Sequence, residues 1–154
     1  MLLSRTSQYA IQSLIFLATY EPGKPVLSRH VAERLGVPVA YLAKIMQDLV
    51  RGGLLSSTRG RYGGFFLREN PSEVNLTRIL ELTEGVRFTD ECVLGLKTCS
   101  DETACPLHRR WMPIKERVLD MLRQETLEDL AQAVKSGLYR IADFPKTLFK
   151  EKET

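Results

Sequence analysis

A chain of 154 residues is about the size of one domain and too short for two large ones. It has 3 cysteines, an odd number that argues against a disulfide scaffold in a chain without an export signal. The net charge of +3 is unevenly spread: residues 1–68 carry 9 Lys and Arg against 3 Asp and Glu, and residues 69–154 carry 13 against 16. This asymmetry predicts an N-terminal surface that binds a polyanion.

The apolar run at 10–18 does not have the features of a signal peptide. Gln12 and Ser13 interrupt it, Arg5 is the one basic residue before it, and no small-residue cleavage site follows. No stretch approaches the roughly 20 apolar residues that span a bilayer. We therefore expect a cytoplasmic protein.

Apolar spacing predicts three helices in the first third of the chain. The first covers 9–20 and ends at the turn-rich segment 21–25. Ser28 is placed to cap a short second helix, which Gly36 ends. Pro38 suits the first turn of a third helix, whose inward face is Leu42, Ile45, Met46, Leu49 and Val50. Two short helices joined by a tight turn predict a helix-turn-helix.

A hairpin is expected directly after these helices. Residues 54–58 indicate a strand, 59–64 a basic turn rich in glycine, and 65–67 the returning strand. We therefore predict a mainly α fold with a small β-wing, that is, a winged helix-turn-helix. The alternative is an unrelated small helical domain with a surface hairpin. The combination of arginines and glycines at the tip favours the wing.

The candidate DNA contacts lie on or beside the three predicted helices and on the wing. Lys44 and Gln47 face outward from the third helix toward phosphates or base edges, whereas its alanines offer only apolar contact. The slim wing tip can approach a minor groove, where Arg59 is the strongest candidate. The glycines of the tip are chiefly conformational requirements of the turn. The full set is Arg5, Tyr9, Ser28, Ala40, Tyr41, Lys44, Gln47, Arg51, Arg59, Gly60 and Arg61.

Four further segments and a tail follow the wing. A helix is expected over 76–83, then a loop containing 92–105, then a long helix whose apolar stripe is Ile114, Val118, Met121 and Leu122. Pro113 either kinks this helix or marks its first turn. Thr126 and Asp129 resemble a capping box for a last helix ending near 136. The predicted organisation is a DNA-binding domain at 1–85, a cysteine loop at 86–108, a dimerisation helix with its following helix at 109–136, and a flexible tail at 137–154.

All three cysteines fall within the predicted loop, in the pattern Cys-x6-Cys-x5-Cys-x2-His that runs from Cys92 through Cys99 and Cys105 to His108. Thiols that served only as buried hydrophobes would have no reason to cluster. The pattern therefore indicates a metal site, an iron–sulfur cluster or a group of reactive thiols.

Together these motifs resemble the iron–sulfur cluster regulators exemplified by IscR, with NsrR and iron-responsive relatives. The similarity covers residues 1–136 and rests on 4–10 (Ser-Arg-Thr-Ser-Gln-Tyr-Ala), Tyr41-Leu42, the glycine-rich wing after Arg59, and the three cysteines. It implies a homodimeric repressor or activator that binds a pseudo-palindromic DNA operator and holds one cluster per subunit. The apolar stripe of the long helix fits dimerisation independently, and packing within one monomer is the alternative.

A cluster needs four protein ligands, and His108 would complete the set for a 2Fe–2S cluster. Other members of the family hold a 4Fe–4S cluster with an acidic residue near position 8 of the partner subunit. Gln8 is a poor iron ligand, which favours His108 and 2Fe–2S over 4Fe–4S. The six residues between the first two cysteines depart from the five of the IscR pattern, which leaves the cluster type open.

Two alternatives remain for the cysteines, and two other protein classes are disfavoured. The same residues could bind structural zinc, although only Cys105 and His108 have the short spacing typical of zinc sites. A cluster-free protein could act as a thiol redox switch. An enzyme is not expected, because no nucleophile–base pair or phosphate loop has a suitable context. The charge asymmetry and basic wing argue against an interaction module that does not bind DNA.

Overall fold

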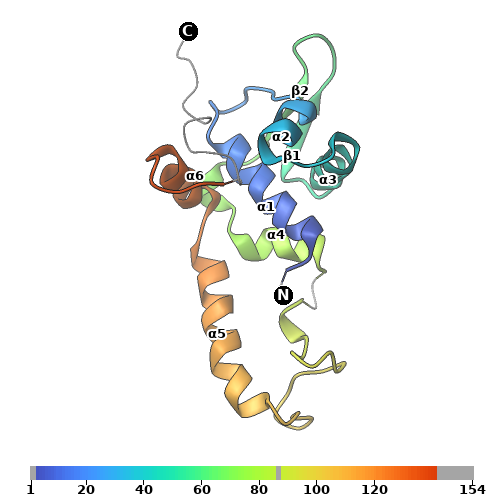
Figure 1. Ribbon diagram of the computed structural model, residues 1–154, viewed down its shortest axis with the longest axis vertical. Coiled ribbons are helices and arrows are strands. Elements are labelled where there is room, and N and C mark those ends of the chain that lie inside the picture. Colours follow the sequence, from blue (N-terminus) through green and yellow to red (C-terminus); the bar gives the residue numbers. More distant parts are fainter. Residues whose placement is uncertain (1–2, 86–87, 142–154) are drawn as a thin grey trace.

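The computed structural model describes residues 3–85 and 88–141. Figure 1 shows a head made of most of the elements and an arm that projects from it. The elements in chain order are α1 (Arg5–Ala18), α2 (Ser28–Leu35), α3 (Val39–Arg51), β1 (Leu55–Thr58), β2 (Gly64–Leu67), η1 (Pro71–Glu73), α4 (Leu76–Thr83), η2 (Phe88–Asp90), α5 (His108–Gln124) and α6 (Leu127–Lys135).

The head is built around α1, which packs against α3, α4 and α6. Leu14 of α1, Leu42 and Met46 of α3, and Ile79 of α4 are all fully buried. Burying large aliphatic side chains from several helices is the main source of stability in a domain of this size. The three predicted N-terminal helices therefore share one core with elements from the second half of the chain.

The hairpin forms the predicted wing. β1 pairs with β2 in antiparallel register, with Leu55 opposite Leu67 and Thr58 opposite Gly64. Val26, between α1 and α2, exchanges two backbone hydrogen bonds with Phe65, of 2.9 and 2.8 Å, which fixes the base of the wing to the helices. A Cβ on Gly64 would lie 2.6 Å from the Val26 backbone, so this close approach requires glycine.

The arm consists of α5 and the cysteine segment beside it (Figure 1). The C-terminal end of α5 is anchored to the head by two backbone bonds: Leu127 N–H donates to Val74 O at 2.9 Å and Leu76 N–H to Glu125 O at 3.2 Å. α4 packs against both α1 and α5, so it lies between the head and the arm.

Two predicted helix starts are wrong. α1 begins at Arg5 and not near 9, because the Ser4 hydroxyl accepts the Ser7 N–H at 3.1 Å and caps the helix earlier. Ser28 is not the cap of α2: the extended Leu27 precedes the helix and its carbonyl accepts the Val31 N–H, which leaves Ser28 as the first helical residue.

Pro38 caps α3 instead of lying in its first turn. Pro113 lies inside α5, which begins at His108, so the interpretation that it marks the first turn is wrong. The capping box of Thr126 and Asp129 is confirmed at the start of α6. The part of the predicted tail beyond Ile141 lies outside the described residues, and the domain boundaries stay predictions.

Candidate thiol site and nucleic-acid interface

The cysteine loop lies against the N-terminal part of α5. Lys115 of α5 is buried, and its ammonium group donates to the Glu91 carbonyl at 3.3 Å. The Cys99 N–H donates to the Asp90 carbonyl at 3.2 Å, which folds the loop back on itself. These bonds hold the cysteine segment beside His108, at the start of the same helix.

The candidate ligands come together as two pairs. Cys99 Sγ lies 3.6 Å from His108 Nδ1, and Cys105 lies near enough to Cys92 to lower the pKa of the Cys92 thiol. His108 is buried, and its other ring nitrogen, Nε2, lies 2.9 Å from Asp101 Oδ1. Histidines that ligate metals usually donate their second ring N–H to a carboxylate or carbonyl, and Asp101 offers His108 such a partner.

The surroundings of Cys92 favour its thiolate. A backbone hydrogen bond from Leu94 is the largest cause that lowers the pKa of Cys92 below its ordinary value, and burial opposes it. Contacts with Cys105 and the Leu96 backbone and the charge of Lys115 lower the pKa further. A thiolate is the form that binds iron and that reacts with oxidants.

Among residues 3–85 and 88–141, no three His, Cys, Asp or Glu side chains converge closely enough to hold one metal ion. The Gln8 amide donates to the Leu3 carbonyl at 3.3 Å, so this side chain is engaged within its own chain.

Helical spacing could have identified two residues that the sequence analysis missed. Met112 and Lys115 follow His108 at i+4 and i+7, and so share its face of α5. The Met112 sulfur lies 3.8 Å from Cys99 Sγ, and Lys115 contacts the loop as described. A positive charge at this point offsets the negative charge that thiolates bring into a partly buried site.

The outward face of α3 carries the predicted polar candidates. Lys44 and Gln47 are exposed, as is Ala40. Arg51 is exposed too, but it forms an ion pair with Asp48 one turn earlier, and the sequence analysis did not consider this acid. Because the Asp48 carboxylate already neutralises it, Arg51 is a weaker phosphate candidate than Lys44.

The wing tip presents exposed groups without regular structure around them. Arg59, Gly60 and Arg61 are exposed, and Gly60 has φ +100° with open space around it. Tyr62, which the sequence analysis also missed, is 84% exposed, and the Arg61 guanidinium lies 5.7 Å from its ring centre. An aromatic residue within a basic, glycine-rich turn is the signal that could have identified it.

The start of α1 lies against α3. The Tyr9 ring packs edge-to-face on the Tyr41 ring, with centres 5.9 Å apart, and the Thr6 and Tyr41 hydroxyls are 2.8 Å apart. Arg5 is exposed beside them, whereas Ser28 is half-buried at the start of α2. The predicted DNA contacts on α1 and α3 therefore share one part of the head.

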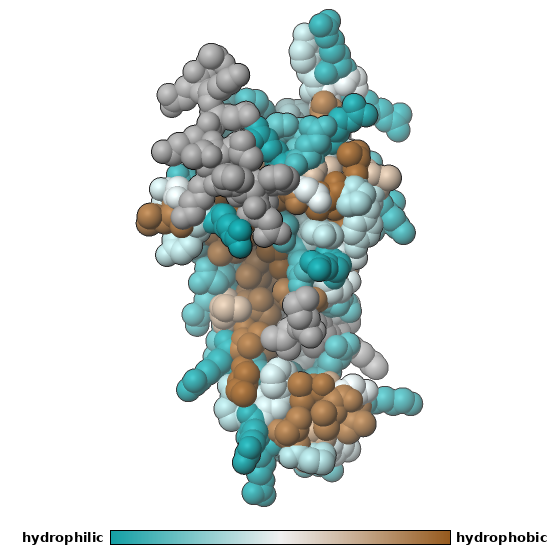
Figure 2. Space-filling model, in the orientation of Figure 1, coloured by the Kyte–Doolittle hydropathy of each residue, from teal (hydrophilic) through white to brown (hydrophobic). Residues whose placement is uncertain are grey.

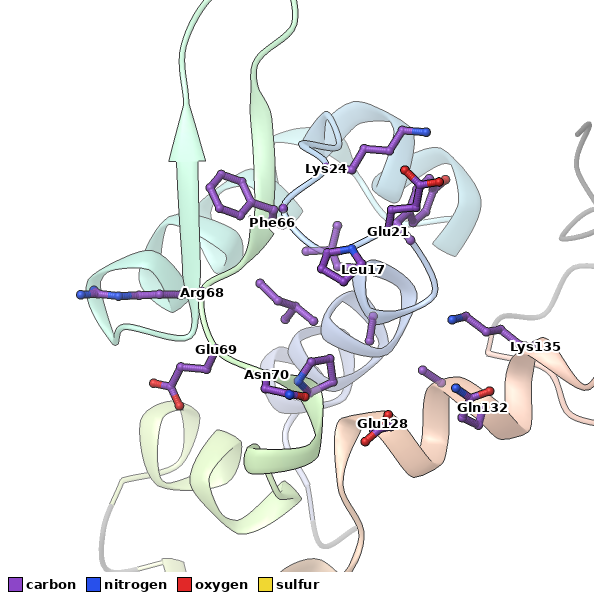
Figure 3. Close-up of a pocket in the computed structure, with 17 residues that line it drawn as sticks. Leu17, Glu21, Lys24, Phe66, Arg68, Glu69, Asn70, Glu128, Gln132 and Lys135 are labelled. Carbon is purple, nitrogen blue, oxygen red and sulfur yellow. The ribbon is translucent and has the colours of Figure 1, made fainter. Parts of the chain in front are cut away.

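A cavity of about 630 Å³ lies elsewhere in the head, between the end of α1, the base of the wing and α6. Leu17 and Phe66 line it on one side and Gln132 and Lys135 on the other (Figure 3). None of the candidate thiol ligands or DNA contacts line this cavity, so it is separate from both.

Apolar side chains gather on the surface of the arm. Figure 2 shows hydrophobic surface on the lower half of the molecule, where α5 and the cysteine loop lie in Figure 1. Leu107, Ile114 and Met121 are 42%, 53% and 51% exposed and recur every seven residues. No helix within the described residues is long and apolar enough to cross a membrane.

Comparisons with known proteins identify the family. A family model named Rrf2 and described as an iron-dependent transcriptional regulator matches residues 3–133. IscR of Pectobacterium atrosepticum, an HTH-type transcriptional regulator, is 27% identical over 130 residues, which cover 84% of this chain and 79% of that protein.

Two solved structures share the fold. CymR, the global cysteine regulator of B. subtilis, matches with a TM-score of 0.71 and 28% identity over 85% of this chain and 96% of its own. T. potens IscR matches with a TM-score of 0.69 and 22% identity over 90% and 91%. These matches confirm the predicted winged-helix fold. Because the matching family consists of regulators, the expectation that the protein is not an enzyme is also confirmed. The chain belongs to the Rrf2 family of transcriptional regulators.

Proposed function

We propose that this regulator binds a pseudo-palindromic DNA operator as a homodimer, and that a 2Fe–2S cluster in the arm controls the binding. The cluster ligands are Cys92, Cys99, Cys105 and His108. A bound cluster supplies a centre whose presence and charge change with iron supply, redox state or nitric oxide. The protein's part is to hold the ligands and to connect them to the DNA-binding head.

The observation that carries this proposal is the pairing of the four ligands. Cys99 Sγ lies 3.6 Å from Nδ1 of His108 at the start of α5, and Cys105 lies near Cys92 in the loop, which a hydrogen bond from Lys115 to the Glu91 carbonyl holds against α5. Two pairs of soft and imidazole donors suit iron in a two-iron cluster. The Asp101 carboxylate on Nε2 leaves Nδ1 of His108 as the nitrogen available to iron.

The apolar stripe of α5 supports the homodimer. Leu107, Trp111, Ile114, Val118 and Met121 alternate at spacings of four and three residues, which is the a/d pattern of a coiled coil. Three of them are substantially exposed in the single chain. A second copy of α5 would cover this stripe and place two heads for two half-sites of an operator.

DNA binding is assigned to α3 and the wing. Lys44, Gln47, Arg59 and Arg61 are exposed and supply charge or hydrogen bonds for phosphates and base edges. Tyr62 joins them at the wing tip, where an exposed ring can contact sugar or base. Arg5 and Tyr41 extend the same surface toward the start of α1.

A thiol redox switch is the second candidate, and the position of two cysteines favours it. Cys92 and Cys105 are free, and Cys105 lies near enough to Cys92 to help lower the pKa of its thiol. Oxidation by a peroxide would convert Cys92 to a sulfenic acid, which Cys105 would resolve to a disulfide with loss of water. Cys99 would take no part in that bond.

Anaerobic purification followed by iron and sulfide analysis tests the first candidate. We expect brown protein with about two irons and two sulfides per chain, and loss of both in Cys92→Ala, Cys99→Ala and Cys105→Ala. Glu102→Gln, an exposed change in the same loop, is the control and should keep both. Colourless protein with stoichiometric zinc would refute the cluster. Metal-free protein that forms a Cys92–Cys105 disulfide would favour the switch.

A further inference from the structure

The first turn of α1 contacts the end of α4 and the start of α3 at once. We propose that Glu84 is a positioning residue. It holds this turn so that the turn places Tyr41 on the DNA-binding face and connects the arm to α3. The role in DNA binding rests on the proposed function, whereas the connection between Glu84 and Tyr41 can be tested without DNA.

Glu84 holds α1 through its carboxylate. Oε1 accepts the Ser4 N–H at 2.8 Å and the Ser7 hydroxyl at 2.5 Å, and Ser7 Oγ lies 2.6 Å from Thr83 Oγ1. Ser7 is fully buried, so loss of the carboxylate would leave its hydroxyl with a weaker set of partners. A carboxylate at a helix N-terminus also interacts favourably with the helix dipole.

The opposite side of the same turn holds α3. The Thr6 and Tyr41 hydroxyls form a 2.8 Å hydrogen bond, and the Tyr9 ring packs edge-to-face on Tyr41. Ser4 and Ser7 therefore contact α4, while Thr6 and Tyr9 contact the N-terminal turn of α3. One helical turn links Glu84 to Tyr41 through two sets of directional contacts.

Glu84 lies at the point of the chain where α4 leads into the cysteine loop, so it can connect that loop to α1 and α3. Glu84 ends α4, and the chain continues from it to η2 and then to Cys92. α4 packs against α5 of the arm, and Leu82 lies against Gly52 at the end of α3, 2.6 Å from where a Cβ would stand. A change in the cysteine loop that displaced the end of α4 would act on Glu84 first.

The hydrogen bonds give a displacement of Glu84 a direct route to Tyr41. With Glu84 in place, Ser4 and Ser7 fix the first turn of α1, and Thr6 holds the Tyr41 hydroxyl. Loss of the Glu84 carboxylate removes the anchor of this turn, and the Thr6–Tyr41 hydrogen bond is weakened with it.

Fluorine NMR of protein labelled with meta-fluorotyrosine tests the connection directly. The chain has 5 tyrosines, and Tyr41→Phe assigns the Tyr41 resonance by its absence. We expect Glu84→Ala to shift or broaden that resonance, and Glu84→Gln to restore it in part because its amide oxygen still accepts. The control is Glu81→Ala, an exposed change on α4 that should leave the resonance in place.

Thr6→Val supplies the second test, since it removes the hydroxyl and keeps the shape. In the Thr6→Val background, Glu84→Ala should move the Tyr41 resonance less than in wild type, because the Tyr9 ring contact is then the remaining link. If Glu84→Ala fails to fold, Ser7→Ala breaks the same link at a small buried site and carries the same expectation. A Tyr41 resonance that is equal in wild type, Glu84→Ala and Ser7→Ala would overturn the proposal.

Affinity for an operator selected from a randomised DNA pool gives the functional result. We expect Glu84→Ala to weaken binding by about 5- to 10-fold, a size typical of coupling between sites, while Glu81→Ala binds as wild type does. Unchanged affinity would overturn the role in DNA binding. If wild-type protein selects no operator, the proposed function fails, and the fluorine spectra still decide whether Glu84 positions Tyr41.

Discussion

The Nδ1 atom of His108 lies 3.6 Å from the sulfur of Cys99, nine residues earlier in the chain. Its other ring nitrogen contacts Asp101. The His108 ring is thereby oriented with Nδ1 toward the Cys99 thiol and Nε2 toward the Asp101 carboxylate. This arrangement leads to the prediction that His108 is the fourth ligand of the cluster.

Two replacements of His108 should therefore separate its role in holding the cluster from its effect on the reduction potential of the cluster. His108→Ala is expected to lose the cluster, whereas His108→Cys should keep one with a lower reduction potential, because imidazole ligation raises the potential relative to thiolate. Visible absorption and a redox titration measure these outcomes. An unchanged absorption spectrum in His108→Ala would show that His108 is not a ligand. Gln8 on the first helix would then be the next candidate for the fourth ligand.

Arg59→Ala at the wing should weaken operator binding and reduce the salt dependence. Loss of one phosphate contact lowers the slope of log K against log salt by about 0.9. Lys135→Ala, an exposed cation on α6 outside the proposed DNA surface, serves as the control. Fluorescence anisotropy at several salt concentrations measures these slopes. Equal slopes for wild type and Arg59→Ala would show that Arg59 does not contact a phosphate.

Ile114→Lys should dissociate the proposed dimer and leave the head folded. Ile114 is 53% exposed in the single chain, so a lysine there costs the monomer little but would be buried and unpaired in a helix pair. Light scattering combined with size exclusion measures the mass. The control is Glu116→Lys, which introduces the same charged side chain at an exposed position of α5. This variant should stay dimeric. A monomeric wild type, or a dimeric Ile114→Lys, contradicts the role given to α5.

Glu84 should make stability depend on pH in the acidic range. Burial raises the pKa of Glu84, but hydrogen bonds from Ser7 and Ser4 outweigh it and hold the pKa below the ordinary 4.5. A depressed pKa in the folded state means that the carboxylate stabilises the fold above the ordinary pKa. This contribution is lost as the pH falls through the lowered value.

Urea unfolding from about pH 6 to about pH 3 measures this contribution. The difference in unfolding free energy between wild type and Glu84→Gln should be largest near pH 6 and shrink on acidification. Glu81→Gln provides the matched comparison. A difference that stays constant over the whole range would show that the charge of Glu84 contributes nothing to stability.

Local patterns were sufficient to predict most of the head. The apolar spacing of α3 and α4, and the glycine turn of the wing, depend on neighbours within one or two turns. The start of α1 was missed because the residues before Tyr9 are mostly polar and show no helical spacing of apolar residues. Those from Arg5 onward are nevertheless helical, because the Ser4 hydroxyl caps the helix at its N-terminus.

Contacts between distant residues were not predictable in this way. The sequence offered no reason to place Cys99 beside His108 and not beside another cysteine, yet the two side chains lie 3.6 Å apart. The Ser7–Glu84 bond spans 77 residues. Such contacts depend on how the loop and α4 pack on other elements, which a single sequence without a structure does not specify.

The affinity of the protein for its selected operator, with and without the cluster, shows whether the cluster controls DNA binding. We expect the anaerobic cluster-loaded protein and its cluster-free form to differ in Kd by at least about 5-fold, with the head folded in both. Cys99→Ala should bind with the affinity of the cluster-free form whether or not iron and sulfide are supplied. Equal affinity of the loaded and cluster-free wild type would contradict the claim that the cluster controls DNA binding.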